Sequence, residues 1–273
     1  MRSAGNPVAA PLVALLVLIS LAGAQEAQAQ ADAAEVARKL NNPIASLISL
    51  PMQFNYDTAL GPDGEGDRFV LNVQPVIPIS ISEDWNLISR TIVPLVQLNG
   101  VPPGNDQGGV GDVFQSLFLS PKAPTAGGWV WGAGPALLVP TATDELLGAE
   151  QWAIGPTAVA LKQAHGWTYG ALTNHVWSFA GSDNRADVNA TLLQPFLSLT
   201  LPSLMTFSLN TESTYDWEGE DWSVPINIGV SQLFKIGQQM QTIQFGARYW
   251  LDSPEGAAEG WGVRLTYTLV FPK

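Results

Sequence analysis

The stretch 261–271, near the C-terminus, alternates between two kinds of side chain. One set is apolar and consists of Trp261, Val263, Leu265, Tyr267, Leu269 and Phe271. The residues between them are mostly small or polar, with Arg264 among them. A period of two puts the two sets on opposite faces of a strand, and about 9–11 residues let a tilted strand cross a bilayer. The stretch therefore predicts a transmembrane β-strand with one face on lipid and the other on a polar lumen.

The alternative for this stretch is an edge strand of a soluble, secreted β-sandwich. Edge strands of soluble sheets usually carry charge or proline in mid-strand, and here only Arg264 does so. Composition favours the membrane interpretation, because 46% of the residues are hydrophobic and only 13% are charged. After residue 25, no run reaches the roughly 18 apolar residues of a membrane-spanning helix. The 26 Gly, 20 Pro and 10 Trp fit many short strands, turns and interfacial indole rings.

Residues 1–29 have the pattern of a secretory signal peptide. Arg2 provides the positive charge and 12–22 the apolar run, and small residues follow, so we expect cleavage between residues 24 and 31. An uncleaved anchor is the alternative, but the apolar run is short for it. The absence of cysteine excludes a disulfide framework and a lipid-attachment cysteine, which is compatible with the envelope of a Gram-negative bacterium.

Strand-like runs recur at intervals of about 20 residues along the rest of the chain. They cover 49–56, 68–82, 84–97, 109–121, 128–140, 151–163, 166–179, 187–201, 204–217, 221–235, 240–251 and 260–271. Twelve runs are an even number, as required when both termini lie on the periplasmic side. We therefore predict an all-β fold, a transmembrane antiparallel β-barrel of about twelve strands over 49–273. A short helical segment over 30–48, with its strand boundary undecided between 43 and 50, is expected to occlude part of the lumen.

The predicted connections alternate between long, acidic loops and short turns. Acidic side chains such as Asp57, Asp63, Asp144 and Glu255 lie in or beside the long set, whereas few lie near the short set. Long outer loops and short periplasmic turns are typical of outer-membrane barrels. The net charge of −12 and the lack of a basic patch disfavour nucleic acid as a partner.

Several prolines lie inside the predicted strands, where each deletes a ladder hydrogen bond. They are Pro75, Pro78, Pro94, Pro135, Pro156, Pro195 and Pro225. Pro75, Pro78 and Pro94 concentrate in the second and third predicted strands. They predict either bulges or a lateral seam through which an apolar solute leaves the lumen sideways.

A set of motifs along the chain resembles a known family. The motifs are 42–51 (NPIASLISLP), 72–78 (NVQPVIP), 109–112 (GVGD), 132–135 (GAGP), 139–141 (VPT), 155–156 (GP) and 177–181 (WSFAG). In order and spacing they resemble the outer-membrane β-barrel family named for the meta-pathway of phenol degradation, whose members are often labelled "transporter" or "neuromedin U". The resemblance runs from about residue 42 to the C-terminus and implies passage of aromatic or other hydrophobic compounds across the outer membrane. It implies no catalytic residue and no cofactor.

The sequence contains only weak signals for an enzyme active site or a metal site. A barrel phospholipase would place His and Ser two residues apart on one strand face, but His175 and Ser178 are three apart and face opposite sides. The acidic run 63–67 resembles part of a calcium loop but lacks its later bidentate Glu. We therefore expect no enzyme activity, no metal and no cofactor.

Charged residues expected to face the lumen are the better candidates for function. Alternation assigns this orientation to six residues, Arg90, Asp112, Glu212, Asp216, Arg248 and Arg264. Charges inside a membrane protein are tolerated when they are paired or hydrated. Two interpretations stay open: a structural ion-pair network that fills the lumen, and a constriction that selects solutes.

The sequence thus predicts a passive outer-membrane channel for small hydrophobic or aromatic solutes. Its expected partners are the solute, outer-membrane lipid and, during biogenesis, the barrel-assembly machinery. The alternative is a non-transporting envelope barrel whose acidic loops bind a partner or cations. The oligomeric state does not follow from the sequence.

Overall fold

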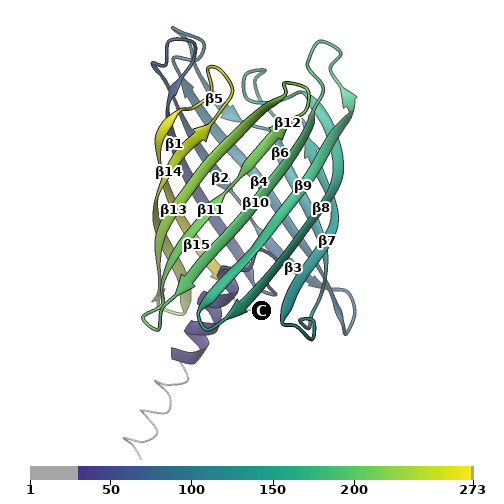
Figure 1. The fold of residues 1–273 in the computed structure, drawn as a ribbon, viewed down its shortest axis with the longest axis vertical. Coiled ribbons are helices and arrows are strands. Elements are labelled where there is room, and N and C mark those ends of the chain that lie inside the picture. The colour runs from purple at the N-terminus through teal and green to yellow at the C-terminus, as the bar shows by residue number, and fades with distance from the viewer. Residues whose placement is uncertain (1–29, 272–273) are drawn as a thin grey trace, which may run out of the picture.

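The computed structural model describes residues 30–271, which form a closed antiparallel β-barrel of twelve strands preceded by one short helix (Figure 1). The last strand pairs with the first from Ile48↔Phe271 to Tyr56↔Val263, and this ladder closes the wall. The prediction of an all-β barrel with twelve strands is confirmed. The predicted signal peptide, 1–29, lies outside the described residues, as do Pro272 and Lys273.

Fifteen strand segments make up the twelve strands of the wall. Nine strands are continuous: β1 (Ile48–Leu60), β4 (Trp85–Asn99), β7 (Trp129–Val139), β8 (Gln151–Ala164), β9 (Trp167–Gly181), β10 (Asn189–Thr200), β13 (Asp221–Ile236), β14 (Gln239–Asp252) and β15 (Gly260–Phe271). Three are divided into two segments: β2 (Gly66–Val73) with β3 (Val76–Ser80), β5 (Asp106–Val110) with β6 (Val113–Pro121), and β11 (Met205–Thr211) with β12 (Ser213–Asp216).

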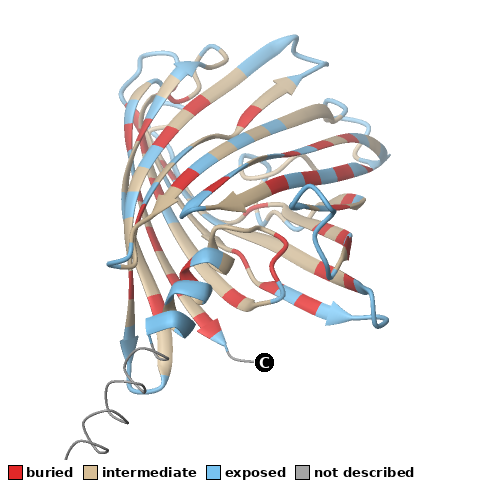
Figure 2. Ribbon diagram, turned by 60° about the horizontal axis from the view of Figure 1, so that its bottom comes forward, coloured by how far each residue is buried: buried red, intermediate tan, exposed pale blue. Residues whose placement is uncertain are grey.

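The faces of β15 alternate as the sequence predicts. Trp261 and Val263 are 65% and 59% exposed, whereas Arg264 and Thr268 are 6% exposed. Figure 2 shows such short bands of buried and exposed residues along many strands of the wall. The apolar set faces outward, where a bilayer would cover it, and the polar set faces the lumen.

Tryptophans gather near the two ends of the barrel. Trp85, Trp129, Trp131 and Trp167 lie beside short turns, and Trp152, Trp177, Trp217, Trp222, Trp250 and Trp261 lie toward the long connections. Nine of these ten side chains are exposed; the remaining one, Trp250, donates its indole N–H to Asp57. Two belts of exposed indole rings are typical of the two interfaces of a membrane-spanning barrel.

The N-terminal helix, residues 30–40, lies at the end of the barrel that carries the short turns, where β15 also ends (Figure 1). Glu35 and Lys39 form an i,i+4 ion pair at 2.7 Å, and the hydrogen bond from Lys39 holds the pKa of Glu35 below its usual range. Arg38 and Gln163 of β8 exchange two hydrogen bonds, which attach the helix to the rim. Among residues 30–271, no helix is long and apolar enough to span a membrane.

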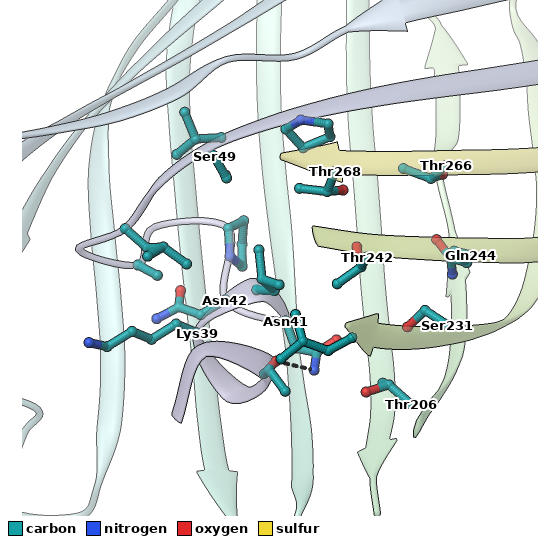
Figure 3. Close-up of a pocket in the computed structure, with 18 of the residues that line it drawn as sticks. Lys39, Asn41, Asn42, Ser49, Thr206, Ser231, Thr242, Gln244, Thr266 and Thr268 are labelled. Carbon is teal, nitrogen blue, oxygen red and sulfur yellow. Dashed lines mark hydrogen bonds between the residues drawn. The ribbon is translucent and has the colours of Figure 1, made fainter. Parts of the chain in front are cut away.

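The helix is shorter than the expected segment, because residues 41–47 are turns and bends rather than helix. The Asn41 side chain donates to the carbonyl of Ala37 and caps the helix end, and Asn42 Oδ1 accepts from the N–H of Ile44 in a turn that follows the helix. Pro43 cannot continue the helical ladder. The segment enters the barrel, where Ile44 is 3% exposed. Figure 3 shows Asn41 and Asn42 beside inward-facing side chains of the wall.

Candidate lumenal site

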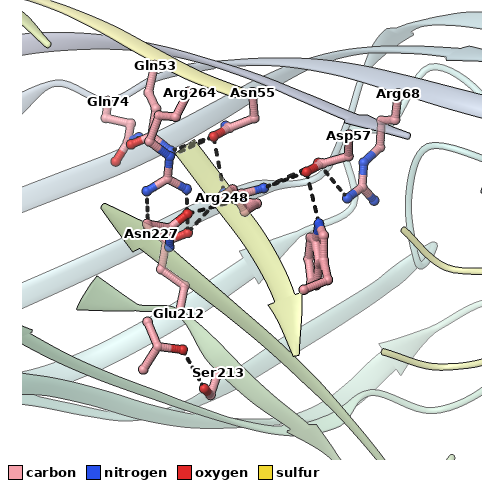
Figure 4. Close-up of polar contacts among 12 residues, drawn as sticks. Gln53, Asn55, Asp57, Arg68, Gln74, Glu212, Ser213, Asn227, Arg248 and Arg264 are labelled. Atoms are coloured by element: carbon pink, nitrogen blue, oxygen red, sulfur yellow. Dashed lines mark hydrogen bonds and ion pairs between the residues drawn. The ribbon is translucent and has the colours of Figure 1, made fainter. Parts of the chain in front are cut away.

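An ion-pair network lines one side of the lumen and joins strands that are neighbours in the wall but far apart in the sequence. Arg264 of β15 binds Glu212 with two hydrogen bonds, of 2.9 and 2.8 Å, in the bidentate geometry that favours arginine. Arg248 of β14 lies between two carboxylates, 3.3 Å from Glu212 and 3.2 Å from Asp57. Arg68 of β2 binds the same Asp57 at 3.1 Å (Figure 4). The network therefore links three arginines through two shared carboxylates.

Neutral side chains complete the network. Asn55 Oδ1 accepts from both Arg248 and Arg264, at 3.1 and 2.8 Å, and Asn227 Oδ1 accepts from Arg248 at 2.9 Å. Such bonds are needed because a buried guanidinium is costly unless its donors are satisfied. Arg248 and Arg264 are each only 6% exposed.

The sequence analysis missed Asp57, which it assigned to the acidic loops. This residue lies inside β1, is 1% exposed, and accepts from Arg68, Arg248 and Trp250. Asn55 and Asp57 are two residues apart and therefore lie on the same face of the strand. This spacing could have identified Asp57 as a lumenal residue.

The six predicted lumenal charges lie in different places. The structure brings Glu212, Arg248 and Arg264 together in the network. Arg90 of β4 donates to Gln74 Oε1 at 3.1 Å and lines the same lumen.

Asp112 and Asp216 lie outside this network. Asp112 accepts from the backbone N–H groups of Ala142 and Ala149 and so holds the long connection after β7. Asp216 is exposed at the end of β12 and accepts from the N–H of Glu218 in the following turn.

The opposite side of the lumen carries two apolar clusters, with neutral polar side chains such as Asn86, Ser116 and Asn174 between them. At the end nearer the helix, Ile44 packs in a buried cluster with Val76, Ile88, Phe118, Val159, Leu161 and Leu172. Farther along, Ala136, Ala153 and Val176 form a second cluster with Phe114, Leu138 and Val188 packed against it. These residues belong mainly to β4 and to β6 through β9. The lumen therefore has a charged half and an apolar half.

A cavity of about 400 Å³ lies where the two halves face each other. Its apolar wall consists of Ile92, Phe114, Leu138, Val176, Val188 and Leu192. Its polar wall includes Gln74, Arg90 and Glu212. Ligand sites commonly have volumes of about 300–1,000 Å³ and combine apolar surface with polar groups that orient the ligand, and this cavity has that volume and both kinds of side chain.

The prolines of the predicted lateral seam lie in paired wall. On one side of Pro75, Gln74 donates its N–H to the carbonyl of Pro51 in β1 at 2.8 Å. On the other side, Thr91 of β4 donates to the carbonyl of Pro75 at 3.2 Å. Pro75 has no N–H to return the second bond, so the ladder lacks one hydrogen bond here.

Pro94 and Pro78 leave fewer backbone groups of the ladder without a hydrogen bond than Pro75 does. Pro94 accepts from the N–H of Gly111 at 2.8 Å and cannot donate in return, but the Thr141 hydroxyl donates to the Gly111 carbonyl at 2.9 Å instead. Pro78 lies beyond the pair Ser49↔Val76, where β1 ends as a partner of β3. The lateral seam at Pro75, Pro78 and Pro94 stays a prediction.

Metal and catalytic groups are sparse in the described part of the chain. Within residues 30–271, no three His, Cys, Asp or Glu side chains gather in a way that could hold a metal ion. His175 Nδ1 is hydrogen-bonded to the hydroxyl of Thr191 at 2.8 Å, and Ser178 donates to Asp187. The two side chains thus have separate partners.

Comparison with known proteins gives structural matches only. No protein-family model and no curated protein matches the sequence. The structure is similar to an outer membrane channel from Pseudomonas putida F1, with a TM-score of 0.63 and 15% identity over 83% of this chain and 96% of that one. It also aligns with the outer membrane phospholipase of Salmonella typhi, with a TM-score of 0.45 and 9% identity over 82% of this chain and 91% of the other. At 15% identity, the first similarity shows that the fold is that of an outer-membrane β-barrel.

Proposed function

We propose that this protein is a passive channel of the Gram-negative outer membrane that conducts small hydrophobic or aromatic solutes. The observation that carries the proposal is the cavity of about 400 Å³ inside the barrel, with apolar side chains gathered on one side. A lumen that only conducts water and ions needs no such wall, because apolar surface facing water is unfavourable. An apolar solute gains free energy by covering it.

The proposed location and mode of action follow from the same features. The exposed apolar face and the two tryptophan belts fit a bilayer, and the barrel type fits an outer membrane. We propose no enzymatic step, because His175 and Ser178 bind separate partners. The role in degradation of phenol-like compounds rests on the motif resemblance alone.

Orientation in the membrane can be tested by labelling. We expect cysteines at Asp63, Asp144 and Glu255 to react with a membrane-impermeant reagent in intact cells, because their loops lie at the end of the barrel away from the N-terminal helix and the end of β15. Cysteines at Lys122 or Gln238, in the short turns, should react only after the outer membrane is permeabilised. The reverse pattern would refute the orientation.

Transport can be tested by uptake of a small aromatic solute in a deletion strain and its parent. We expect slower uptake in the deletion strain and recovery with the wild-type gene. Val176→Thr replaces a methyl of the apolar wall by a hydroxyl at nearly constant volume and should reduce this recovery. Thr214→Val makes the reverse change in the polar wall of the same cavity and serves as the matched control. Equal uptake in the deletion strain and the parent would refute transport.

A second candidate is a non-transporting envelope barrel whose acidic loops bind a partner or cations. It is favoured by the position of Asp63, Asp144 and Glu255 in connections at one end of the barrel. Liposome swelling separates the two candidates, since a channel accelerates solute entry and a binding protein does not.

A further inference from the structure

Arg90 lies where three lumenal cavities meet. The large cavity of about 400 Å³ lies on the side of the ion-pair network. A cavity of about 230 Å³ and another of about 210 Å³ border the N-terminal segment, and both include Asn41 and Pro43 in their lining. Arg90 lines each of the three. A solute that moves between the large cavity and the cavities beside the N-terminal segment therefore passes this guanidinium.

The hydrogen bonding of Arg90 differs from that of the other lumenal arginines. Its guanidinium donates one bond, to Gln74, whereas an arginine has five N–H donors. Within residues 30–271, no carboxylate forms an ion pair with it. Glu212 attracts Arg90 only from beyond ion-pair distance, so four donors of Arg90 make no hydrogen bond within the described part of the protein and can bind a solute.

The nearby carboxylates are already engaged. Asp57 is shared by two arginines, and so is Glu212, and both Glu212 oxygens accept from Arg264. The network and the cavity together hold four arginines, Arg68, Arg90, Arg248 and Arg264, against these two carboxylates. This local excess of positive charge lies inside a protein whose overall net charge is −12. A charge in a membrane-embedded lumen calls for a counter-charge, which a solute can provide.

We propose that the large cavity is a binding site for small aromatic monoanions, with the carboxylate of the solute on Arg90 and its ring on the apolar wall. This inference rests on the proposed channel function and names its substrate class. The planar guanidinium can bind a carboxylate with two parallel hydrogen bonds. Phe114, Leu138 and Val176 provide the surface for the ring. A neutral aromatic lacks the first interaction, and an inorganic anion lacks the second.

Binding can be measured by titrating the folded full-length barrel in detergent with three probes: benzoate, benzyl alcohol and acetate. We expect benzoate to bind about 10-fold or more tightly than either of the others, because each lacks one of the two interactions. Equal affinities for benzoate and benzyl alcohol would overturn the role of charge. Equal affinities for benzoate and acetate would overturn the role of the apolar wall.

Substitution of Arg90 locates the site. Arg90→Gln should weaken benzoate binding about 10-fold or more and leave benzyl alcohol binding unchanged. Arg38→Gln removes the same charge from the helix outside the lumen and should change neither affinity. Unchanged benzoate binding in Arg90→Gln would overturn the assignment. Arg90→Lys keeps the charge without the planar fork, so if the glutamine variant does not fold, a weakened benzoate affinity in the lysine variant supports the site and an unchanged one overturns it.

The binding experiment is separable from the test of transport. If benzoate binds through Arg90 but the deletion strain takes up aromatic acids normally, the channel function fails and the site stands. If uptake of aromatic solutes depends on the protein but benzoate binds no better than benzyl alcohol, the channel stands and the anion site fails.

Discussion

The two halves of the lumen are held together by different interactions. In the charged half, Arg248 and Arg264 reach across to carboxylates on other strands, and each contact requires one geometry. In the apolar half, Ile44 and Phe118 pack without directional bonds, and the N-terminal segment supplies part of the packing. A charged half resists rearrangement because any unpaired group is costly, whereas an apolar half can repack around a solute.

The backbone ladders are irregular in both halves of the lumen. In the apolar half, the pairing between β6 and β7 skips Gly134 and Pro135, and the pairing between β8 and β9 skips Gly155 and Pro156. Both glycines allow a close approach of the neighbouring strand: a Cβ on Gly134 would lie 2.0 Å from the carbonyl oxygen of Leu117. In the charged half, the register of β13 and β14 shifts between Val224 and Pro225, and β11 and β12 are divided at Glu212. The halves therefore differ in their side chains, and apolar packing on one side with a fixed charge pattern on the other suits a channel that must accommodate a ring and orient its polar group.

The largest effect is expected for a change in the charged half. Asp57→Asn removes the negative charge that Arg68 and Arg248 share, and we expect the free energy of unfolding to fall by about 4 kcal/mol, because breaking a buried pair leaves uncompensated charge. Urea unfolding followed by tryptophan fluorescence measures it. Asp216→Asn, at an exposed carboxylate, is the control and should change stability by less than about 0.5 kcal/mol. Equal effects of the two would mean that the network does not stabilise the barrel.

A substitution in the apolar half should reduce the free energy of unfolding slightly less than Asp57→Asn does, and it should also change the conductance of the channel. Phe118→Ala removes a fully buried ring that packs in the cluster with Ile44, and we expect a loss of about 3 kcal/mol in the free energy of unfolding. The lost packing loosens the N-terminal segment, so single-channel conductance in planar bilayers should rise. Asp57→Asn should leave that segment in place. A conductance increase in Asp57→Asn and none in Phe118→Ala would show that the charged half, and not the apolar half, holds the N-terminal segment in place.

The sequence could predict the barrel because one pattern, a period of two over the thickness of a bilayer, repeats along the chain. The sequence was less informative where a local conformation depends on contacts with residues far away along the chain. The boundary between helix and first strand stayed undecided over 43–50, because Ile44 is buried against strands that come later in the chain, and that contact accompanies an irregular conformation. The division between β2 and β3 falls at Pro75, one of the prolines expected to mark a bulge, whereas the divisions between β5 and β6 and between β11 and β12 have no signal in the alternation.

The candidate site was predictable only in part. Alternation assigned Arg90, Glu212, Arg248 and Arg264 to the lumen, but which of them meet depends on the register of β1, β14 and β15, which the sequence does not reveal. Asp57 was missed because it comes directly before an acidic loop. The apolar half of the lumen was also missed, because an apolar inner face resembles a lipid-facing one in sequence.

A smaller effect is expected where the two halves meet, at Pro75. Its carbonyl accepts from Thr91, and the return bond is missing. Pro75→Val supplies the missing N–H, and we expect a gain of about 1 kcal/mol in the free energy of unfolding. If the prolines form a lateral seam, Pro75→Val combined with Pro94→Val should also slow uptake of a hydrophobic solute and leave a small polar solute unaffected. Unchanged hydrophobic uptake in this double variant would leave a structural irregularity without a transport role.

The smallest effect is expected for Pro94→Val alone. Pro94 and Pro75 both lack the backbone N–H that would return a ladder hydrogen bond. At Pro94, however, the Thr141 hydroxyl donates to the Gly111 carbonyl that faces the proline, and it also accepts from the N–H of Val113. Since that carbonyl is already satisfied, a new N–H at residue 94 competes with Thr141 rather than filling a vacancy. We expect stability to change by less than about 0.5 kcal/mol, against the gain at Pro75. In the Thr141→Val background the carbonyl is unpaired, so Pro94→Val should there stabilise the barrel by about 1 kcal/mol. The same effect in both backgrounds would show that Thr141 does not replace the missing ladder bond.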